Sequence, residues 1–301
     1  MKEKSNSLYV YTFYRFINVL KKHRIKKELD HCFKNQNIKG TILISNEGIN
    51  GSLSGTKENL DNAIKILKKL LCIRKLIVKI NKNNFIPFNK LRIRIKKEIV
   101  SLGQGKINVN KLRGQLINPK YWNKVITEKN IRLIDVRNDF EIDIGSFRGA
   151  ERAMTKSFRE FPASIKKLNL EKNSKIAMYC TGGIRCEKAS AFLKKKGYKN
   201  VVQLDGGILN YMKYIKVNSQ NSLWTGECFV FDDRVTVKEN LNRGNYVQCY
   251  GCRRPITKSE TLSKFYKKGV SCQYCFKERT KKQKQNSEMR QTQIESFKIN
   301  N

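Results

Sequence analysis

The sequence predicts an α+β domain, followed by an α/β domain with a parallel sheet and a small cysteine-rich tail. Three observations lead to this prediction. Residues 8–102 contain strand-type and helix-type runs in the order β-α-β-β-α-β. Residues 118–218 alternate buried strand runs with helical spacing, which is the pattern of a parallel sheet. Two C-x2-C pairs follow near the carboxyl end. We place the four segments at residues 1–113, 114–218, 219–280 and 281–301.

The first segment has the element order of a ferredoxin-like (acylphosphatase-like) sandwich. Two runs have helical spacing, residues 17–33 and 57–71. Strands are expected at 8–16, 39–46, 76–80 and 91–102. Such sheets often bind RNA through exposed aromatic rings, although aromatic residues more often lie in a core. The rings open to both interpretations are Tyr9, Tyr11, Phe13 and Phe88. In the last strand Arg92 and Arg94 alternate with apolar residues, so one strand face is basic.

A short polar motif, Glu47-Gly48-Ile49-Asn50-Gly51, follows the second strand. An acidic residue and an asparagine beside two glycines indicate a binding site, in which Glu47 and Asn50 would contact substrate. The alternative is a hairpin connection that uses glycine and asparagine for positive φ angles. The residues alone leave both interpretations open.

The residue most suggestive of chemistry is Cys180. It follows the strand-type run 174–179 and is separated from a helical run, 187–196, by a glycine-containing loop. The loop consists of Thr181, Gly182, Gly183, Ile184 and Arg185. Glycines let successive N–H groups point inward, the helix start adds unpaired N–H groups, and the arginine adds a fixed charge. All three favour the thiolate, which predicts a reactive cysteine of low pKa. The alternative is an inert buried cysteine beside a glycine-rich cap.

Other polar residues are expected close to this loop, because parallel strands end at the same edge of a sheet. Asp135 and Arg137 end one buried strand, and Glu141 follows them. We expect these three to support the loop by hydrogen bonds. Cys186 lies six residues after Cys180, and is expected either to pack beneath the loop or to resolve an oxidised Cys180.

The composition indicates a polyanionic partner. The chain has 301 residues, 63 Lys+Arg against 25 Asp+Glu and a net charge of +38. This favours RNA binding, although the abundance of lysine, asparagine and isoleucine also fits the mutational bias of an AT-rich genome. No run approaches the roughly 18 apolar residues that a membrane span needs, and the amino terminus lacks a secretory pattern. Nine cysteines without such a signal favour reduced thiols in the cytoplasm.

The four cysteines of the tail have the spacing of a structural zinc site. The pairs Cys249/Cys252 and Cys272/Cys275 are separated by 19 residues. Four thiolates complete a tetrahedral Zn²⁺ shell and leave no open position for catalysis. The alternative is four free thiols in a small domain. The segment after residue 280 is polar and charged, and is expected to be a flexible or helical basic tail.

Several motifs together resemble known proteins. The motifs LIDVRNDFE, IGSFRGA, CTGGIR and QLDGGI occur in the order of the rhodanese domain, although Tyr211 replaces a tryptophan that many rhodanese domains carry. The C-x4-R loop is also of rhodanese length, one residue shorter than the C-x5-R loop of tyrosine phosphatases. The motifs GTILISNEGING, FREFP and YCTGGIRCEKA resemble those of the bacterial tRNA uridine(34) hydroxylase family, over about residues 8–280.

This resemblance implies O2-dependent conversion of the wobble uridine in the tRNA anticodon arm to 5-hydroxyuridine, with Cys180 as the active cysteine. O2 would be a co-substrate. The two histidines, His23 and His31, do not form an iron site with a carboxylate, and no G-x-G-x-x-G indicates a flavin. We therefore expect the Cys180 thiolate to add to C6 of uridine, which makes C5 nucleophilic toward O2. Two alternatives stay open: a sulfurtransferase carrying a persulfide on Cys180, and a non-enzymatic zinc-containing RNA-binding protein.

Overall fold

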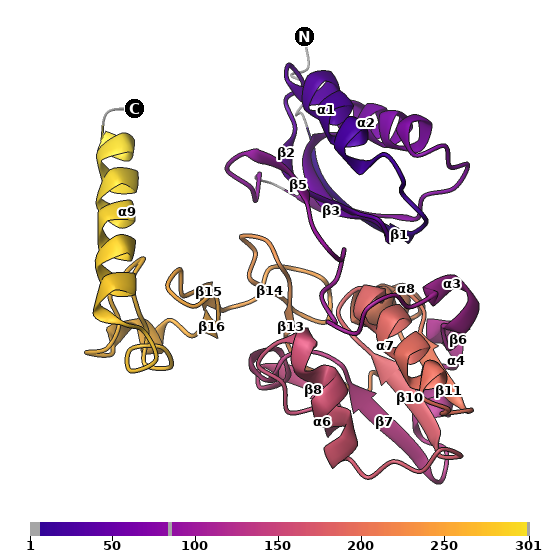
Figure 1. The fold of residues 1–301 in the computed structure, drawn as a ribbon. Coiled ribbons are helices and arrows are strands. Elements are labelled where there is room, and N and C mark those ends of the chain that lie inside the picture. Colours follow the sequence, from indigo (N-terminus) through magenta and orange to yellow (C-terminus); the bar gives the residue numbers. More distant parts are fainter. Residues whose placement is uncertain (1–6, 84–85, 300–301) are drawn as a thin grey trace.

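The computed structural model describes residues 7–83 and 86–299, with side chains through residue 296 (Figure 1). Its first domain is a five-stranded sheet in the order β4-β1-β3-β2-β5, covered on one face by two helices. The elements are β1 (Leu8–Phe16), α1 (Lys22–Phe33), β2 (Lys39–Ser45), β3 (Gly48–Thr56), α2 (Lys57–Leu70), β4 (Val78–Asn83) and β5 (Leu91–Ile95). The ferredoxin-like prediction is confirmed, with β5 added as an extra strand parallel to β2.

The first helix begins at Lys22, so our predicted start at residue 17 is wrong. The backbone explains the difference. The N–H groups of Ile17 and Val19 donate to the carbonyls of Glu47 and Asn46 in the β2–β3 turn, which keeps this stretch out of the helix. The turn itself is a tight hairpin, and Gly48 has a φ of +147°, where a Cβ would lie 2.0 Å from the Arg15 carbonyl oxygen. The hairpin connection, one of the two interpretations of this motif, is therefore present.

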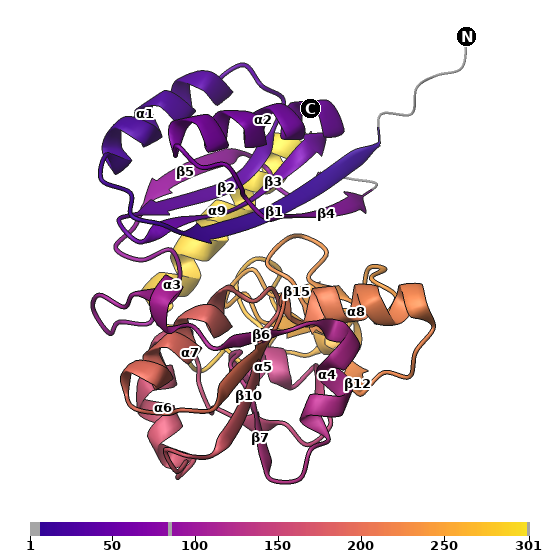
Figure 2. The same cartoon turned by 90° about the vertical axis from the view of Figure 1, so that its right-hand side faces the viewer.

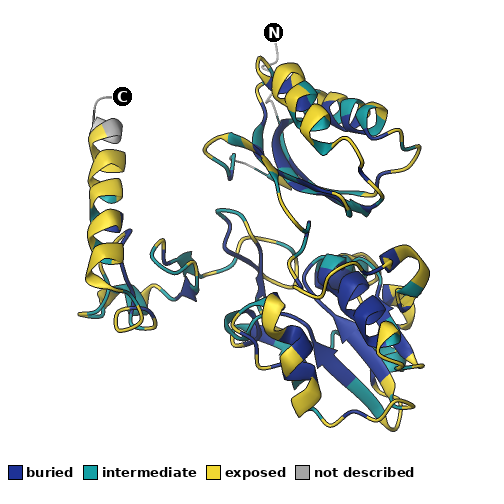
Figure 3. Ribbon diagram, viewed as in Figure 1, coloured by how far each residue is buried: buried dark blue, intermediate teal, exposed yellow. Residues whose placement is uncertain are grey.

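The second domain contains a five-stranded parallel sheet in the order β6-β11-β10-β7-β9. Its strands are β6 (Gln115–Ile117), β7 (Ile131–Asp135), β9 (Glu151–Arg152), β10 (Lys175–Tyr179) and β11 (Val201–Leu204). Its helices are α3 (Val109–Leu112), α4 (Pro119–Ile126), α5 (Asp139–Ile142), α6 (Phe161–Lys167), α7 (Ile184–Lys195) and α8 (Gly207–Asn218), with a 3-10 turn at Phe158–Glu160. The strands and α7 are the most buried part of the molecule (Figure 3).

Helix α7 is buried on nearly all sides because the two domains enclose it. One hydrophobic cluster joins α7 and the parallel sheet to Phe16 of β1 and to residues of the connecting segment, Ile99, Leu102 and Val109. That segment lies within the range 1–113, yet it packs on the second domain. Figures 1 and 2 show the parallel-sheet domain on the side of the first sheet opposite α1 and α2. The two domains therefore meet at the amino-terminal end of α7, where Cys180 is located.

The remaining chain divides into two parts. Strand β12 (Trp224–Gly226) pairs with β8 (Gly145–Phe147), and β13 (Cys228–Phe229) pairs with β14 (Thr236–Val237). These strands share a core cluster with the parallel sheet. A separate small unit, which we call the cysteine unit, contains β15 (Val247–Gln248), β16 (Pro255–Ile256), a 3-10 turn (Ser259–Leu262) and α9 (Lys281–Ile299).

The basic tail is a helix, α9, so the flexible state in our prediction is corrected to the helical one. Two arginines attach it to the cysteine unit: Arg279 donates to Ser287 Oγ at 2.6 Å and also bonds the Gly251 carbonyl, and Arg290 donates to the Gly269 carbonyl at 3.1 Å. These bonds supply hydrogen-bond donors to backbone carbonyl groups in the turns beside the two cysteine pairs. Among the helices within residues 7–83 and 86–299, none combines the length and hydrophobicity required to cross a membrane.

Candidate active site

Cys180 lies at the carboxyl end of β10, and its loop leads directly into α7. The side chain is fully buried, and its sulfur accepts a hydrogen bond from the Gly183 N–H at 3.1 Å. Gly183 has a φ of +99°, and a Cβ there would lie 2.9 Å from the Tyr14 hydroxyl oxygen. Only glycine adopts this backbone without strain and leaves that space free. The loop therefore turns a backbone N–H onto the sulfur, as the two glycines predict.

The surroundings of Cys180 stabilise its thiolate. Burial by itself raises the pKa of the thiol, but hydrogen bonds from the Cys186 thiol and N–H, the charge of Arg185 and the Gly183 N–H together lower the pKa to about 5. At neutral pH the side chain is therefore ionised. A thiolate held by fixed donors in a buried site is a strong nucleophile that needs no separate base.

Arg185 is held by Glu141 rather than pointing freely at the sulfur. Its two terminal nitrogens donate to the two carboxylate oxygens of Glu141 at 2.6 and 2.7 Å, and both side chains are almost fully buried. The Thr181 hydroxyl also donates to Glu141, at 3.3 Å. Burial favours the neutral form of Glu141, yet the charge and hydrogen bonds of Arg185 keep its pKa below the ordinary value. Glu141 thus fixes both the second and the sixth residue of the Cys180–Arg185 loop.

Behind Glu141 lies a fully buried ion pair between Asp135 and Arg137. The guanidinium donates to the Asp135 carboxylate at 2.6 Å and to the carbonyls of Glu141 and Gly145 at 3.0 and 2.6 Å. It therefore ties the end of β7 to the helix that carries Glu141 and to the strand after it. The structure brings these three residues together behind the Cys180 loop, and none of them contacts the Cys180 sulfur.

Two more buried cysteines lie beside the loop. The Cys186 thiol, in the first turn of α7, hydrogen-bonds the Cys180 sulfur, and burial raises its pKa well above the ordinary value. It is therefore a proton donor to the thiolate at neutral pH. Cys228, on β13, is also buried, and burial raises its pKa to about 12. Cys186 packs beneath the loop and touches Cys180, so the geometry suits both packing and redox pairing.

The first domain places two side chains over the loop, and sequence reasoning missed both. Tyr14 donates to the Glu187 carboxylate at 2.8 Å. The Lys79 ammonium donates to the Gly182 carbonyl at 2.6 Å and also bonds the Gly206 carbonyl. Burial lowers the pKa of Lys79 to about 8, although the charge of Cys180 opposes this shift. No local pattern marks these residues, because their contacts span more than 100 positions along the chain.

Glu47 and Asn50 lie at the domain interface. Lys188 of α7 has a fully buried side chain and donates to the two oxygens of Glu47 at 2.8 and 2.7 Å, and to Glu98 at 2.5 Å. Asn50 donates to the Ile99 carbonyl at 3.1 Å. The helix that starts at the Cys180 loop is therefore anchored to the first domain by ion pairs. We assign Glu47 and Asn50 to this anchor; their direct contact with substrate stays a prediction.

The four tail cysteines converge, as their spacing predicts. Their sulfur atoms all lie within 4.8 Å of one another, and three of the six separations are 4.0, 3.8 and 3.8 Å. A tetrahedral Zn²⁺ with Zn–S bonds of about 2.3 Å places its sulfurs about 3.8 Å apart. Gly251 lies between the first pair, where a Cβ would be 2.2 Å from the Val270 carbonyl oxygen. The donor set and its dimensions therefore fit zinc.

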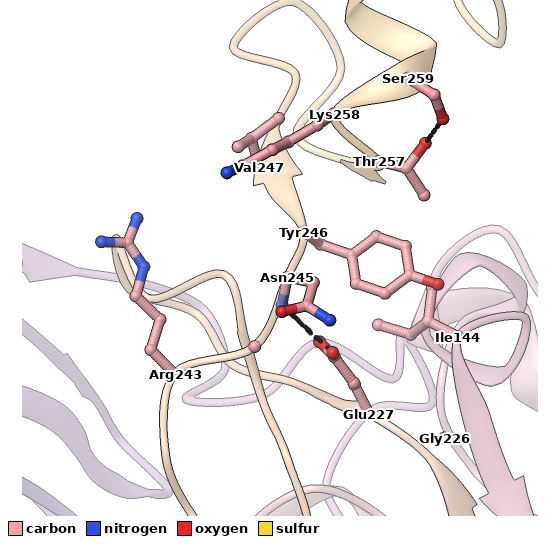
Figure 4. Close-up of a pocket in the computed structure, with 11 residues that line it drawn as sticks. Ile144, Gly226, Glu227, Arg243, Asn245, Tyr246, Val247, Thr257, Lys258 and Ser259 are labelled. Atoms are coloured by element: carbon pink, nitrogen blue, oxygen red, sulfur yellow. Dashed lines mark hydrogen bonds between the residues drawn. The ribbon is translucent and has the colours of Figure 1, made fainter.

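A cavity of about 810 Å³ lies between the edge of the second domain and the cysteine unit (Figure 4). Ile144 and Glu227 line it on one side, and Tyr246 and Lys258 on the other. The Glu227 carboxylate accepts hydrogen bonds from the Thr236 hydroxyl at 2.6 Å and from the Asn245 N–H at 3.1 Å. The cavity shares no residue with the Cys180 loop, and Glu227 at its wall joins the two parts of the chain.

Comparisons with known proteins cover both domains. Residues 8–99 match the UPF0176 acylphosphatase-like domain, and residues 118–214 match the rhodanese-like domain. Among solved structures, a rhodanese-like domain protein from Staphylococcus aureus is 24% identical, covers 32% of this chain and 90% of its own, and has a TM-score of 0.28. A rhodanese-related protein from Thermoplasma volcanium is 29% identical, covers 33% and 92%, and has a TM-score of 0.29. These structures correspond to about a third of the chain.

A relative matches almost the whole length. The tRNA uridine(34) hydroxylase of Pelagibacter ubique (strain HTCC1062) is 46% identical over 288 residues, which are 95% of this chain and 93% of that protein. The chain therefore belongs to the tRNA uridine(34) hydroxylase family.

Proposed function

We propose that this chain is an O2-dependent enzyme that converts uridine 34 of tRNA to 5-hydroxyuridine in the cytoplasm. The observation that carries this proposal is the buried Cys180 thiolate, held by backbone N–H groups in a chain that is 46% identical to a tRNA uridine(34) hydroxylase. The net charge of +38 suits a tRNA substrate. A wobble base lies in a single-stranded loop and can be splayed out without melting a duplex.

In the proposed reaction the Cys180 sulfur adds to C6 of uracil, and C5 becomes nucleophilic toward O2. One oxygen atom ends on C5 as the hydroxyl group, and the other leaves as water. Loss of the C5 proton then breaks the C6–S bond, which restores the C5=C6 double bond and releases the Cys180 thiolate. This balance requires two electrons and two protons beyond the C5–H that is replaced. We propose thiols as the reductant class, since the Cys186 thiol is in hydrogen-bond contact with Cys180 and two thiols release two electrons on forming a disulfide.

Access to the sulfur sets a condition on this chemistry. Cys180 has no exposed surface, and Lys79 and Tyr14 stand over its loop. The uracil ring reaches the sulfur only when this cover moves. A cover that closes behind the substrate would keep water from the C5 carbanion, which water would otherwise reprotonate before O2 reacts.

Nucleoside mass spectrometry of tRNA tests the proposed function. The chain is expressed in a bacterial host that lacks 5-hydroxyuridine-type modifications. We expect 5-hydroxyuridine to appear at position 34 and to depend on O2 during growth. If it does not appear, and the purified chain carries a sulfane sulfur on Cys180 that it passes to cyanide, the protein is a sulfurtransferase and the proposal is wrong.

We also propose that the four tail cysteines hold a structural zinc ion. The fit of their sulfur separations to a tetrahedral shell supports this assignment. The zinc ion would have a structural role only, because four thiolates leave no coordination position for substrate. It would connect the two cysteine-bearing turns, to which α9 is hydrogen-bonded.

Removal of the zinc ion is expected to unfold the cysteine unit and leave the two larger domains folded. Structural zinc contributes on the order of 10 kcal/mol to the folding of such small units. The purified chain should contain about one zinc per molecule. Cys252→Ser should lose the metal, and limited proteolysis should then cleave between residues 247 and 299. Cys72→Ser, at an exposed cysteine, is the control. Equal zinc content in both variants would contradict the assignment.

A further inference from the structure

The face of the first sheet that is not covered by α1 and α2, and that lies toward the second domain, carries one row of polar side chains that crosses all five strands. The register places Arg92 of β5 opposite Thr41, Thr41 opposite Ser52, Ser52 opposite Thr12, and Thr12 opposite Lys79 of β4. Residues directly opposite each other on neighbouring strands share a face. We call this row, from Arg92 to Lys79, the polar strip. With strands about 4.8 Å apart, its four steps span roughly 19 Å.

The polar strip is accessible along its whole length. Each of its five residues is at least partly exposed. On one side, Val10 and Ser54 of the neighbouring row are fully buried. On the other side, Asn50 is bonded to the carbonyl of Ile99 in the segment that leads to the second domain. A ligand that lies on this face therefore reaches the strip and Arg94 of the next row, but not Val10 or Ser54.

The chemistry of the strip is that of an anion-binding track. Arg92 and its neighbour Arg94 are exposed, and neither side chain has an ion pair or hydrogen bond with another described residue. The hydroxyl groups of Thr12 and Ser52 lie 3.0 Å apart in the middle. Within the five strands there is no aspartate or glutamate. Arginine and hydroxyl groups are the side chains that most often bind phosphate and sugar oxygens of nucleic acids.

The two ends of the strip distinguish it from the general positive charge of the chain. Arg92 ends it at the outer edge of the sheet, and Lys79 ends it at the carbonyls of Gly182 and Gly206 in and beside the Cys180 loop. The strip is thus a continuous row of polar side chains on the first domain that ends at the loop of the reactive cysteine.

We propose that the polar strip, together with Arg94, binds the sugar-phosphate backbone of the anticodon loop and directs its nucleotide 34 to Cys180. This inference rests on the proposed function for the identity of the RNA. It assigns the first domain a role in substrate binding through backbone contacts. Of the four rings open to both interpretations, Tyr11 and Phe13 lie in the hydrophobic core and Tyr9 packs against it. The bases are left free, so the strip does not select sequence.

The test is equilibrium binding of an anticodon stem-loop RNA and of whole tRNA to the full chain by fluorescence anisotropy, at several salt concentrations. The test variant is Arg92→Ala/Arg94→Ala. Its control is Lys65→Ala/Lys69→Ala, which removes the same charge from exposed positions of α2 on the other face of the domain. We expect the test variant to bind about tenfold or more weakly, with a salt slope reduced by about two, while the control changes less than about twofold.

The outcomes separate this proposal from the proposed function. An equal loss of RNA affinity in the test and control variants, or an unchanged salt slope in the test variant, would contradict the strip proposal even if the chain hydroxylates tRNA. If RNA binding depends on the strip but the chain makes no 5-hydroxyuridine, the strip proposal stands and the proposed hydroxylase activity is rejected. Where the activity is present, the test variant should raise KM for the stem-loop and leave kcat at saturation unchanged, because Arg92 and Arg94 do not contact the Cys180 loop.

Discussion

Replacing Cys180 by serine should abolish 5-hydroxyuridine formation, lowering the rate by about a thousandfold or more. The two side chains have nearly the same shape, so the loop and its Gly183 N–H stay in place. A serine hydroxyl is not ionised at neutral pH, however, and cannot add to C6 of uracil without a base. Among the described residues around Cys180, the donors already point at the sulfur and none is an acceptor poised to take that proton. Nucleoside mass spectrometry on tRNA measures the loss.

The pH dependence of the thiolate provides a second, independent measure of the same prediction. A pKa of about 5 means that Cys180 is ionised from pH 6 upward and becomes protonated as the pH falls through 5. The ultraviolet absorbance of a thiolate, taken as the difference between wild type and Cys180→Ser, should therefore be constant from pH 6 to 8 and fall near pH 5. In denaturant the same difference should titrate near 8.5, the ordinary cysteine value.

Two results would contradict the role of Cys180. A serine variant that still forms 5-hydroxyuridine at a tenth of the normal rate would exclude the sulfur as the nucleophile. A thiolate absorbance that appears only above pH 8 in the native protein would show that the loop does not lower the pKa. The serine variant should still bind tRNA, which separates lost chemistry from lost folding.

Local sequence patterns were sufficient for the reactive loop. A strand run, a cysteine, two glycines, an arginine and a helical run specify the backbone geometry, because only glycine accepts a φ of +99° at position 183. The position of Glu141 near the loop also follows from local rules, since parallel strands end at one edge of a sheet. Its pairing with Arg185 depends on side-chain reach, which periodicity does not contain.

Contacts between the domains were beyond local patterns. The motif at Glu47 is visibly polar, yet its partner Lys188 is 141 positions away and looks like one more surface lysine in a basic chain. Lys79 alternates with apolar neighbours in its strand. This alternation shows that its side chain faces away from the core, but it does not identify the group that the side chain contacts. The same limit applies to Ile17 and Val19, where hydrogen bonds to a distant turn prevail over helical spacing.

Replacing Glu141 by glutamine should destabilise the protein by about 3–5 kcal/mol, because it leaves the Arg185 charge buried without its partner. The Arg185 and Glu141 side chains are 7% and 0% exposed, so water cannot replace the lost charge. The matched control is Glu151→Gln in the same domain. Glu151 also pairs with an arginine, Arg132, but these side chains are 30% and 33% exposed. An exposed pair of this kind contributes about 1 kcal/mol or less, so urea denaturation should separate the two variants clearly.

The stability difference should itself depend on pH, and its sign follows from the pKa of Glu141. This pKa is below the ordinary value in the folded protein, so the carboxylate stabilises the fold above the unfolded pKa, and that stabilisation is lost as the pH falls through the folded value. Wild type and Glu141→Gln should therefore converge in stability at acid pH and differ most near neutrality. A glutamine variant that costs no more than Glu151→Gln at pH 7 would mean that Arg185 finds another partner. In that case the Thr181 hydroxyl, 3.3 Å from Arg185, would be the group that holds the loop.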